Sequence, residues 1–228
     1  MIPPSFSIID ISQPISSLTA CFPGDIPFSQ TVTVDYAHSG VMNLTAFTMS
    51  PHVGTHADAP VHVHGDLQRP SLGSDTIGQL PLSPFIGPAA VLDLSPWTEA
   101  IRWEHVEPLL KKWPNTPPRL LFKTQSANRY DHFQPPYAWP GVDLVENLAA
   151  LGVVLIGIDT PSVDHVDSKH LETHHALIKA GIVWLENLDL TDAPLHVETE
   201  NPPFLVALPL KMMESEASPV RAALLVPA

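Results

Sequence analysis

The amino-acid sequence predicts a single α/β domain that spans residues 1–228 and is built on a mixed β-sheet. Segments with the apolar pattern of strands alternate with three segments that have the pattern of amphipathic helices, as is typical of α/β proteins. Several strands near the N-terminus follow one another without a helix between them, so some strand pairing should be antiparallel. Hydrophobic residues make up 44% of the chain and charged residues 15%, enough for a sizeable core, and no linker-like stretch separates two periodic regions.

The expected strands are short apolar or alternating segments bounded by turn residues. Thr and Val alternate in the second of them, and the sixth is an apolar run that ends in Asp159-Thr160-Pro161-Ser162. Polar groups at the carboxyl end of such a strand often lie near a functional site. Glu186 follows the seventh strand. The expected strands cover residues 8–11, 31–36, 43–49, 89–94, 119–123, 153–158, 182–185, 204–210 and 222–226.

The expected helices cover residues 103–113, 142–151 and 168–181. Gly152 is a natural C-terminal stop for the second helix, and Ser168 a natural N-cap for the third. Within the third helix, His170 and His174 are four residues apart and should share one face. His175 should point elsewhere.

Charge and cysteine content narrow the class of protein. The formal net charge is -13, which argues against nucleic-acid binding and against anionic membrane surfaces. Cys21 is the single cysteine, so no disulfide can form within the chain, which fits a reducing compartment. The N-terminus lacks the pattern of a signal peptide, and no apolar run reaches the roughly 18–20 residues of a membrane helix. The expected location is the cytoplasm.

The stretch from His52 to His62 contains most of the ionisable side chains that are candidates for a functional site. With the period of two that an extended strand has, one face is small and apolar and the other carries every ionisable group. A helix is disfavoured here by Gly54, Thr55 and Pro60. The polar face consists of His52, Gly54, His56, Asp58, Pro60 and His62.

Three imidazoles and one carboxylate on one strand face predict a metal site. Histidine and aspartate are ligands of zinc, manganese, iron and cobalt, and the same groups buried without partners would be costly. An ordinary polar sheet face is the alternative. His64 continues the same register and is expected at the rim of the site.

The remaining candidates are ambiguous from the residues alone. His174 could be a ligand or part of a solvated helix face, and Glu186 a ligand or a surface carboxylate. Cys21 is expected to be a small apolar filler and not a nucleophile. Phe22 lies on a turn-rich loop, where its ring could cover a pocket or could simply fill space in the packing.

The pattern His52-x-Gly-Thr-His56-x-Asp58-x-Pro60-x-His62 resembles the signature of the cyclase-like metal-dependent hydrolases. The resemblance runs nearly from end to end. Three further blocks are similar to the formamidases of this family, and not only to the family at large. They are Phe22-Pro-Gly-Asp-Ile-Pro-Phe28, Ile156-Gly-Ile-Asp-Thr-Pro-Ser162 followed by Ser168-Lys169, and Ala207-Leu-Pro-Leu-Lys211 with Ala217-Ser-Pro-Val-Arg221.

The resemblance implies a hydrolase that converts N-formyl-L-kynurenine to L-kynurenine and formate in tryptophan catabolism, by metal-activated water. It implies that His52, His56 and Asp58 bind one of two divalent metal ions, most often zinc, with manganese or cobalt as alternatives. Asp58 and Glu186 would bridge to a second ion bound by His174. His62 would be the proton donor and acceptor. The family fold is a β/β/α, swivelling-domain-like arrangement, usually a homodimer.

One position departs from the formamidase pattern. The formamidases have tryptophan at a substrate-contacting position where this chain has Phe22. Phenylalanine keeps the aromatic face and loses the indole N–H donor, so substrate preference is open while the ligand set is intact. The alternatives are a related cyclic-amide hydrolase, such as one that opens isatin, and a metal-binding protein without catalysis. A nucleophile hydrolase is disfavoured because the chain has no G-x-S-x-G elbow.

Overall fold

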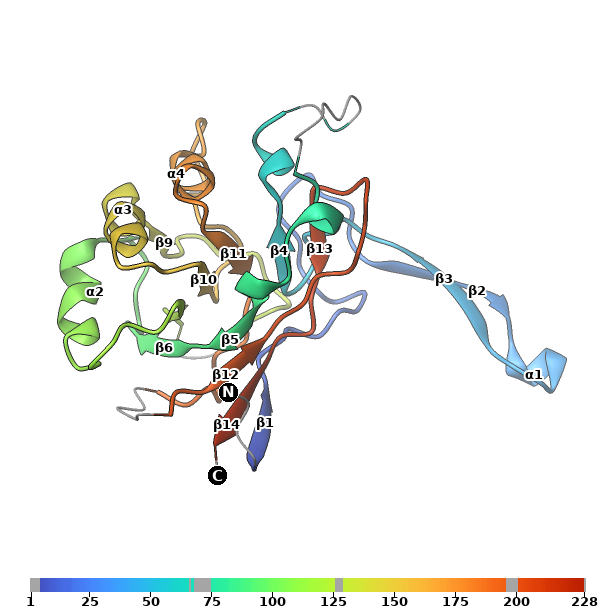
Figure 1. Ribbon diagram of the computed structural model, residues 1–228. Coiled ribbons are helices and arrows are strands. Elements are labelled where there is room, and N and C mark those ends of the chain that lie inside the picture. The colour runs from blue at the N-terminus through green and yellow to red at the C-terminus, as the bar shows by residue number, and fades with distance from the viewer. Residues whose placement is uncertain (1–4, 66, 68–74, 126–128, 196–200, 228) are drawn as a thin grey trace.

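A mixed six-stranded sheet forms the centre of the computed structural model, which describes residues 5–65, 67, 75–125, 129–195 and 201–227 (Figure 1). Residues 1–4, part of the region where no signal peptide is expected, lie outside this range. Four neighbouring strands of the sheet pair in parallel, and the two strands at one end join through antiparallel pairings, which confirms the mixed α/β prediction. In spatial order the strands are β13 (Ala217–Pro219), β4 (His56–Asp58), β11 (Val183–Glu186), β10 (Leu155–Ile158), β8 (Arg119–Lys123) and β6 (Ala90–Asp93).

The three expected helices are present and pack on one side of the parallel strands (Figure 1). Their apolar sides, with Leu144 and Leu177 among them, form one buried cluster with Ile156 and Trp184 of the sheet. Burying these faces is the main favourable contribution to the packing of this layer. The helices are α2 (Trp103–Leu110), α3 (Val142–Ala150) and α4 (Glu172–Ala180).

The start of α4 corrects the sequence prediction. The helix begins four residues later than expected, and its N-cap is Leu171, with a φ of 49°. Ser168 lies before the helix, where its hydroxyl accepts a hydrogen bond from the Leu171 amide at 3.0 Å and donates one to Glu172 at 2.8 Å. His170 is therefore outside the helix and does not share a helical face with His174.

A second sheet covers the other side of the central sheet. A separate buried cluster joins the two sheets, with Leu121 and Leu185 from the central one and Leu205 and Leu224 from the second. Strand β5 (Ile86–Pro88) of this second sheet and strand β13 of the central sheet were not anticipated, because each is only three residues long. The second sheet contains, in order, β1 (Phe6–Asp10), β14 (Ala223–Pro227), β12 (Phe204–Val206) and β5 (Ile86–Pro88).

An antiparallel hairpin projects from this body as an arm (Figure 1). It is made of β2 (Ser29–Val34) and β3 (Leu44–Thr48), with the short helix α1 (Tyr36–Ser39) near its tip. Almost every residue of the two strands is exposed. The expected strand over 43–49 is confirmed, but a turn separates it from the histidine stretch. Shorter elements are β7 (Ala100–Ile101), β9 (Trp139–Pro140), η1 (Pro60–His62), η2 (Ile77–Gln79) and η3 (Ser83–Phe85).

The part of the chain that the structure describes contains no helix that is long and apolar enough to cross a membrane.

Candidate metal centre and its cavity

The histidine stretch is not one continuous strand, which corrects the prediction for residues 52–62. Only β4, from His56 to Asp58, is extended and paired, and there the period of two places both side chains on one face as expected. Gly54, with a φ of 71°, forms a turn before the strand, and Pro60 begins a 3₁₀ helix after it. The turn and the 3₁₀ helix, and not a strand register, bring His52 and His62 to the site.

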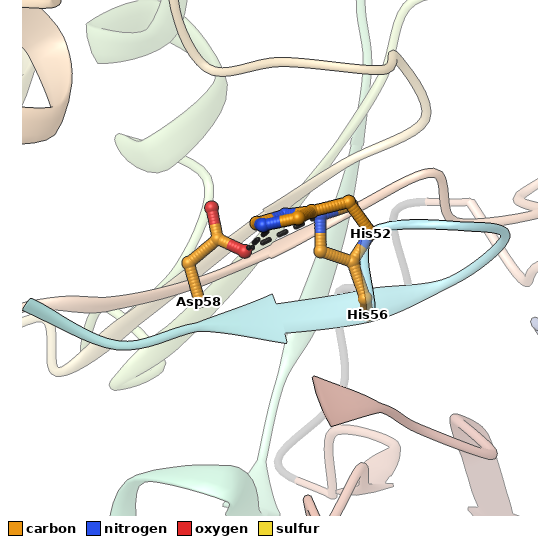
Figure 2. Close-up of side chains that lie close together, drawn as sticks. All are labelled: His52, His56 and Asp58. Atoms are coloured by element: carbon orange, nitrogen blue, oxygen red, sulfur yellow. Dashed lines mark ion pairs between the residues drawn. The ribbon is translucent and has the colours of Figure 1, made fainter. Parts of the chain in front are cut away.

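His52, His56 and Asp58 converge on one point (Figure 2). The Oδ1 atom of Asp58 lies 3.0 Å from Nδ1 of His52 and 3.3 Å from Nε2 of His56. Nδ1 of His56 lies 2.9 Å from the carbonyl oxygen of Gly54, which orients the ring and turns Nε2 toward the carboxylate. The turn and strand β4 thus hold these three side chains together in one half of the site.

Glu186 joins this half of the site to a second one around His174. Its Oε2 lies 3.2 Å from Nε2 of His56, and its Oε1 lies 3.7 Å from Nε2 of His174. Asp58 has the same arrangement, since its Oδ2 lies 3.7 Å from Nε2 of His174. Each carboxylate therefore presents one oxygen to each half, which is the arrangement of two bridging ligands.

His62 completes the group from an exposed position. Its ring centroid lies 4.5 Å from that of His52 and 5.6 Å from that of His174. Asp58, His62 and His174 have ligand atoms within 4.8 Å of one another, so the geometry allows either a ligand or a proton-transfer role for His62. The pKa of His62 is lowered, first because the surrounding protein displaces water and then because His52 and His174 are cationic neighbours.

The residues of this centre fit a divalent cation. Nε2 of His56 and Oδ1 of Asp58 are buried, and neither has a hydrogen-bond partner among the described residues. Although burial alone lowers the pKa of each imidazole, the Asp58 carboxylate raises the pKa of His52 to about 11 and that of His56 to about 9. Protons thus balance the carboxylate charge in the metal-free protein, and a cation would displace them. Nitrogen and oxygen donors of this kind suit zinc, manganese, iron and cobalt.

Four residues near the centre were missed by sequence reasoning. Asp164 holds His174 in place, with its Oδ2 2.6 Å from Nδ1 of the imidazole, and a carboxylate in this position is typical behind a metal-binding histidine. Nε1 of Trp184 donates a hydrogen bond to Oδ2 of Asp58 at 3.1 Å. Glu216 lies 3.6 Å from His52. Tyr137 lies on the cavity wall. Sequence alone gives no signal for them, because each reaches the site through tertiary packing.

A cavity of about 900 Å³ opens onto the metal centre. Phe22 is part of its wall and packs edge to face on Phe133, with ring centroids 5.0 Å apart. Cys21 also lines the cavity, but burial raises the pKa of its thiol, which disfavours the thiolate that a nucleophile needs. The whole segment from Asp159 to Ser162 lines the cavity, as the sequence led us to expect. His64 is exposed and is not part of the wall.

Comparisons with known proteins identify the family of this chain and solved structures that share its fold. The Cyclase family model matches residues 9–165. The kynurenine formamidase of Paracidovorax citrulli is 42% identical over 220 residues, which cover 96% of both chains, and that of Salinibacter ruber is 39% identical over 96% and 97% of the two chains. Among solved structures, isatin hydrolase A of Labrenzia aggregata superimposes with a TM-score of 0.78 at 20% identity, over 97% of this chain and 94% of that one. A predicted metal-dependent hydrolase of Bacillus stearothermophilus superimposes with a TM-score of 0.76 at 24% identity, over 97% of this chain and 98% of that one.

Proposed function

The chain belongs to the cyclase family, and we propose that it is a kynurenine formamidase, which hydrolyses N-formyl-L-kynurenine to L-kynurenine and formate. The observation that carries the proposal is the pair of carboxylates, Asp58 and Glu186, each of which faces histidines of both halves of a metal centre that adjoins a cavity. The curated relatives support the substrate, since proteins that are 37–42% identical over nearly the full length have the name kynurenine formamidase.

The proposed centre would hold two divalent ions per subunit, with zinc as the proposed metal and manganese or cobalt as alternatives. His52, His56 and Asp58 would bind one ion and His174 the other, while Asp58 and Glu186 bridge them. The donor distances described above support this division. A bound divalent cation would lower the pKa of a water molecule and polarise the formyl carbonyl group.

The chain's own residues perform the rest of the reaction. As the oxygen of water bonds to the formyl carbon, His62 takes the proton that water loses. When the bond between carbon and the aniline nitrogen breaks, His62 returns the proton to that nitrogen, and formate and the free amine leave. We assign this role to His62 because its ring is exposed to the cavity, unlike those of the buried His56 and His174. Phe22 would contact the aromatic ring of the substrate.

Three broader expectations accompany the proposal. We propose one cyclase-type domain over residues 1–228, with the β/β/α, swivelling-domain-like arrangement, and we propose the cytoplasm as its location. The two buried clusters on either side of the central sheet support the domain assignment, because the central strands contribute to both of them. The single cysteine supports a reducing compartment.

We further propose a homodimer in which the hairpin arm of one chain packs on a second copy. A two-stranded ribbon is marginally stable in water on its own. Yet this arm exposes Val32, Val41 and Phe47, which are 60%, 72% and 65% exposed. Residues 29–48 also contain no lysine or arginine and only one acidic residue, on a chain with a net charge of -13, so two arms add little to the repulsion between copies.

Light scattering tests whether the arm mediates dimer formation. The wild-type protein is expected at twice the mass of the chain, and Phe47→Glu is expected to shift it toward the monomer because it buries a charge in the contact. Phe47→Leu keeps an apolar side chain and should remain dimeric. A monomeric wild-type protein, or a fully dimeric Phe47→Glu variant, contradicts this role of the arm.

Turnover of N-formyl-L-kynurenine before and after chelation tests the function. We expect kynurenine release that a chelator abolishes and that added zinc or manganese restores, because the centre binds a cation in place of the protons on its histidines. A metal-replete protein that opens isatin and leaves N-formyl-L-kynurenine intact would identify a related cyclic-amide hydrolase. Full metal content without turnover of either compound would support a metal-binding protein without catalysis.

A further inference from the structure

Buried polar atoms without a partner gather around the cavity. Four such side-chain atoms occur among the described residues, and two of them, on His56 and Asp58, belong to the metal centre. The other two are Nε1 of Trp97 and the hydroxyl of Tyr137, and both residues line the cavity. Tyr137 is only 6% exposed. A buried hydroxyl without a partner is rare and costly, and such groups are characteristic of sites that bind a ligand.

The backbone after Tyr137 is fixed to two elements beside the metal centre. The carbonyl oxygen of Ala138 accepts a hydrogen bond from the hydroxyl of Thr160, two residues after β10, at 3.0 Å. The carbonyl oxygen of Pro140 accepts one from Thr173, the neighbour of His174, at 2.7 Å. The position of Tyr137 is therefore tied to the strand and helix that bound the site.

The side chain lies between the aromatic part of the cavity wall and the metal centre. Its ring packs against Phe133, with centroids 6.2 Å apart, and Phe133 in turn packs on Phe22. The hydroxyl lies close to the side chain of Ser162 without the geometry of a hydrogen bond, and it feels the charge of Glu186. Burial, followed by the charge of Glu186, raises the pKa of the phenol, so Tyr137 remains a protonated hydrogen-bond donor.

We propose that Tyr137 is a further catalytic residue, whose O–H group donates a hydrogen bond to the carbonyl oxygen of the scissile amide. The inference rests on the proposed function. As water adds to the formyl carbon, negative charge develops on that oxygen, and the phenol stabilises it without giving up its proton. The donor is oriented before the substrate binds, and such preorganised donors lower the barrier most effectively in a site from which water is excluded.

The variant Tyr137→Phe tests this role, because it removes only the hydroxyl. We expect kcat to fall by about 10²–10³-fold, as for the loss of one oxyanion donor, with little change in KM. Metal content should be unchanged. The Tm should be unchanged or higher, because the free protein loses no hydrogen bond. The wild-type protein, purified in parallel, is the control, because the other two tyrosines lie on the arm and on the cavity wall.

The readouts separate this inference from the proposed function. Normal kcat in metal-replete Tyr137→Phe overturns the role of the hydroxyl even if the protein is a formamidase. A lower Tm also overturns it, with or without turnover, because the hydroxyl would then be bonded in the free protein. If the wild type lacks activity on N-formyl-L-kynurenine, the proposed function fails, and the Tm of Tyr137→Phe still decides whether its hydroxyl is unpartnered.

Discussion

Asp58→Asn is expected to empty the metal centre and abolish turnover. Both oxygens of Asp58 face histidines, Oδ1 toward His52 and His56 and Oδ2 toward His174, so one substitution affects both halves of the site. Asparagine keeps the size of the side chain but removes its charge and replaces one acceptor oxygen with a donor. Removing a residue that only hydrogen-bonds to a metal ligand usually lowers metal affinity by about 10–100-fold. The loss here should be larger, because Asp58 is itself a proposed ligand.

Elemental analysis of the purified variant measures this effect directly, with circular dichroism as the check on folding. Glu107→Gln is the matched control, since it neutralises a carboxylate that pairs with Lys111 on the surface of α2, 3.0 Å away. That variant should retain the wild-type metal content and activity. A folded Asp58→Asn protein with full metal content would remove Asp58 from the ligand set.

His62→Ala is expected to separate metal binding from catalysis. The metal content should remain that of the wild type, while kcat falls by about 10²–10⁴-fold, the usual contribution of a positioned acid–base group. The reason is the position of His62, which is exposed at the cavity while the other imidazoles are held by buried carboxylates. Steady-state kinetics together with elemental analysis of the same preparation measures both quantities.

The control for this variant lies two residues along the chain. His64 is exposed and is not part of the cavity wall, so His64→Ala should have normal activity. Near-normal turnover of metal-replete His62→Ala would exclude His62 from proton transfer. Loss of metal in parallel with activity would make His62 a ligand, which its grouping with Asp58 and His174 allows.

Most elements of the fold could be predicted because their signals are local. The strand over 119–123 and the helix over 142–151 have clear apolar periods, and the structure has both within one residue. The three-residue strands β5 and β13 could not be found in this way, because they are too short to have a period and form through their neighbours. The start of the helix at Glu172 depended on a backbone turn at Leu171 that no sequence pattern indicates.

The sequence by itself determined the donor set of the 52–62 stretch, since the alternation of His56 and Asp58 is a local property of an extended chain. Only the tertiary structure decided between a site residue and a surface residue for Glu186. Strand pairing sets Glu186 directly opposite His56, between segments 130 residues apart. Likewise, Asp164 and His174 meet through hydrogen bonds from the start of a helix to a loop. Such contacts follow from the register and packing of distant segments, and periodicity within one segment contains no information about them.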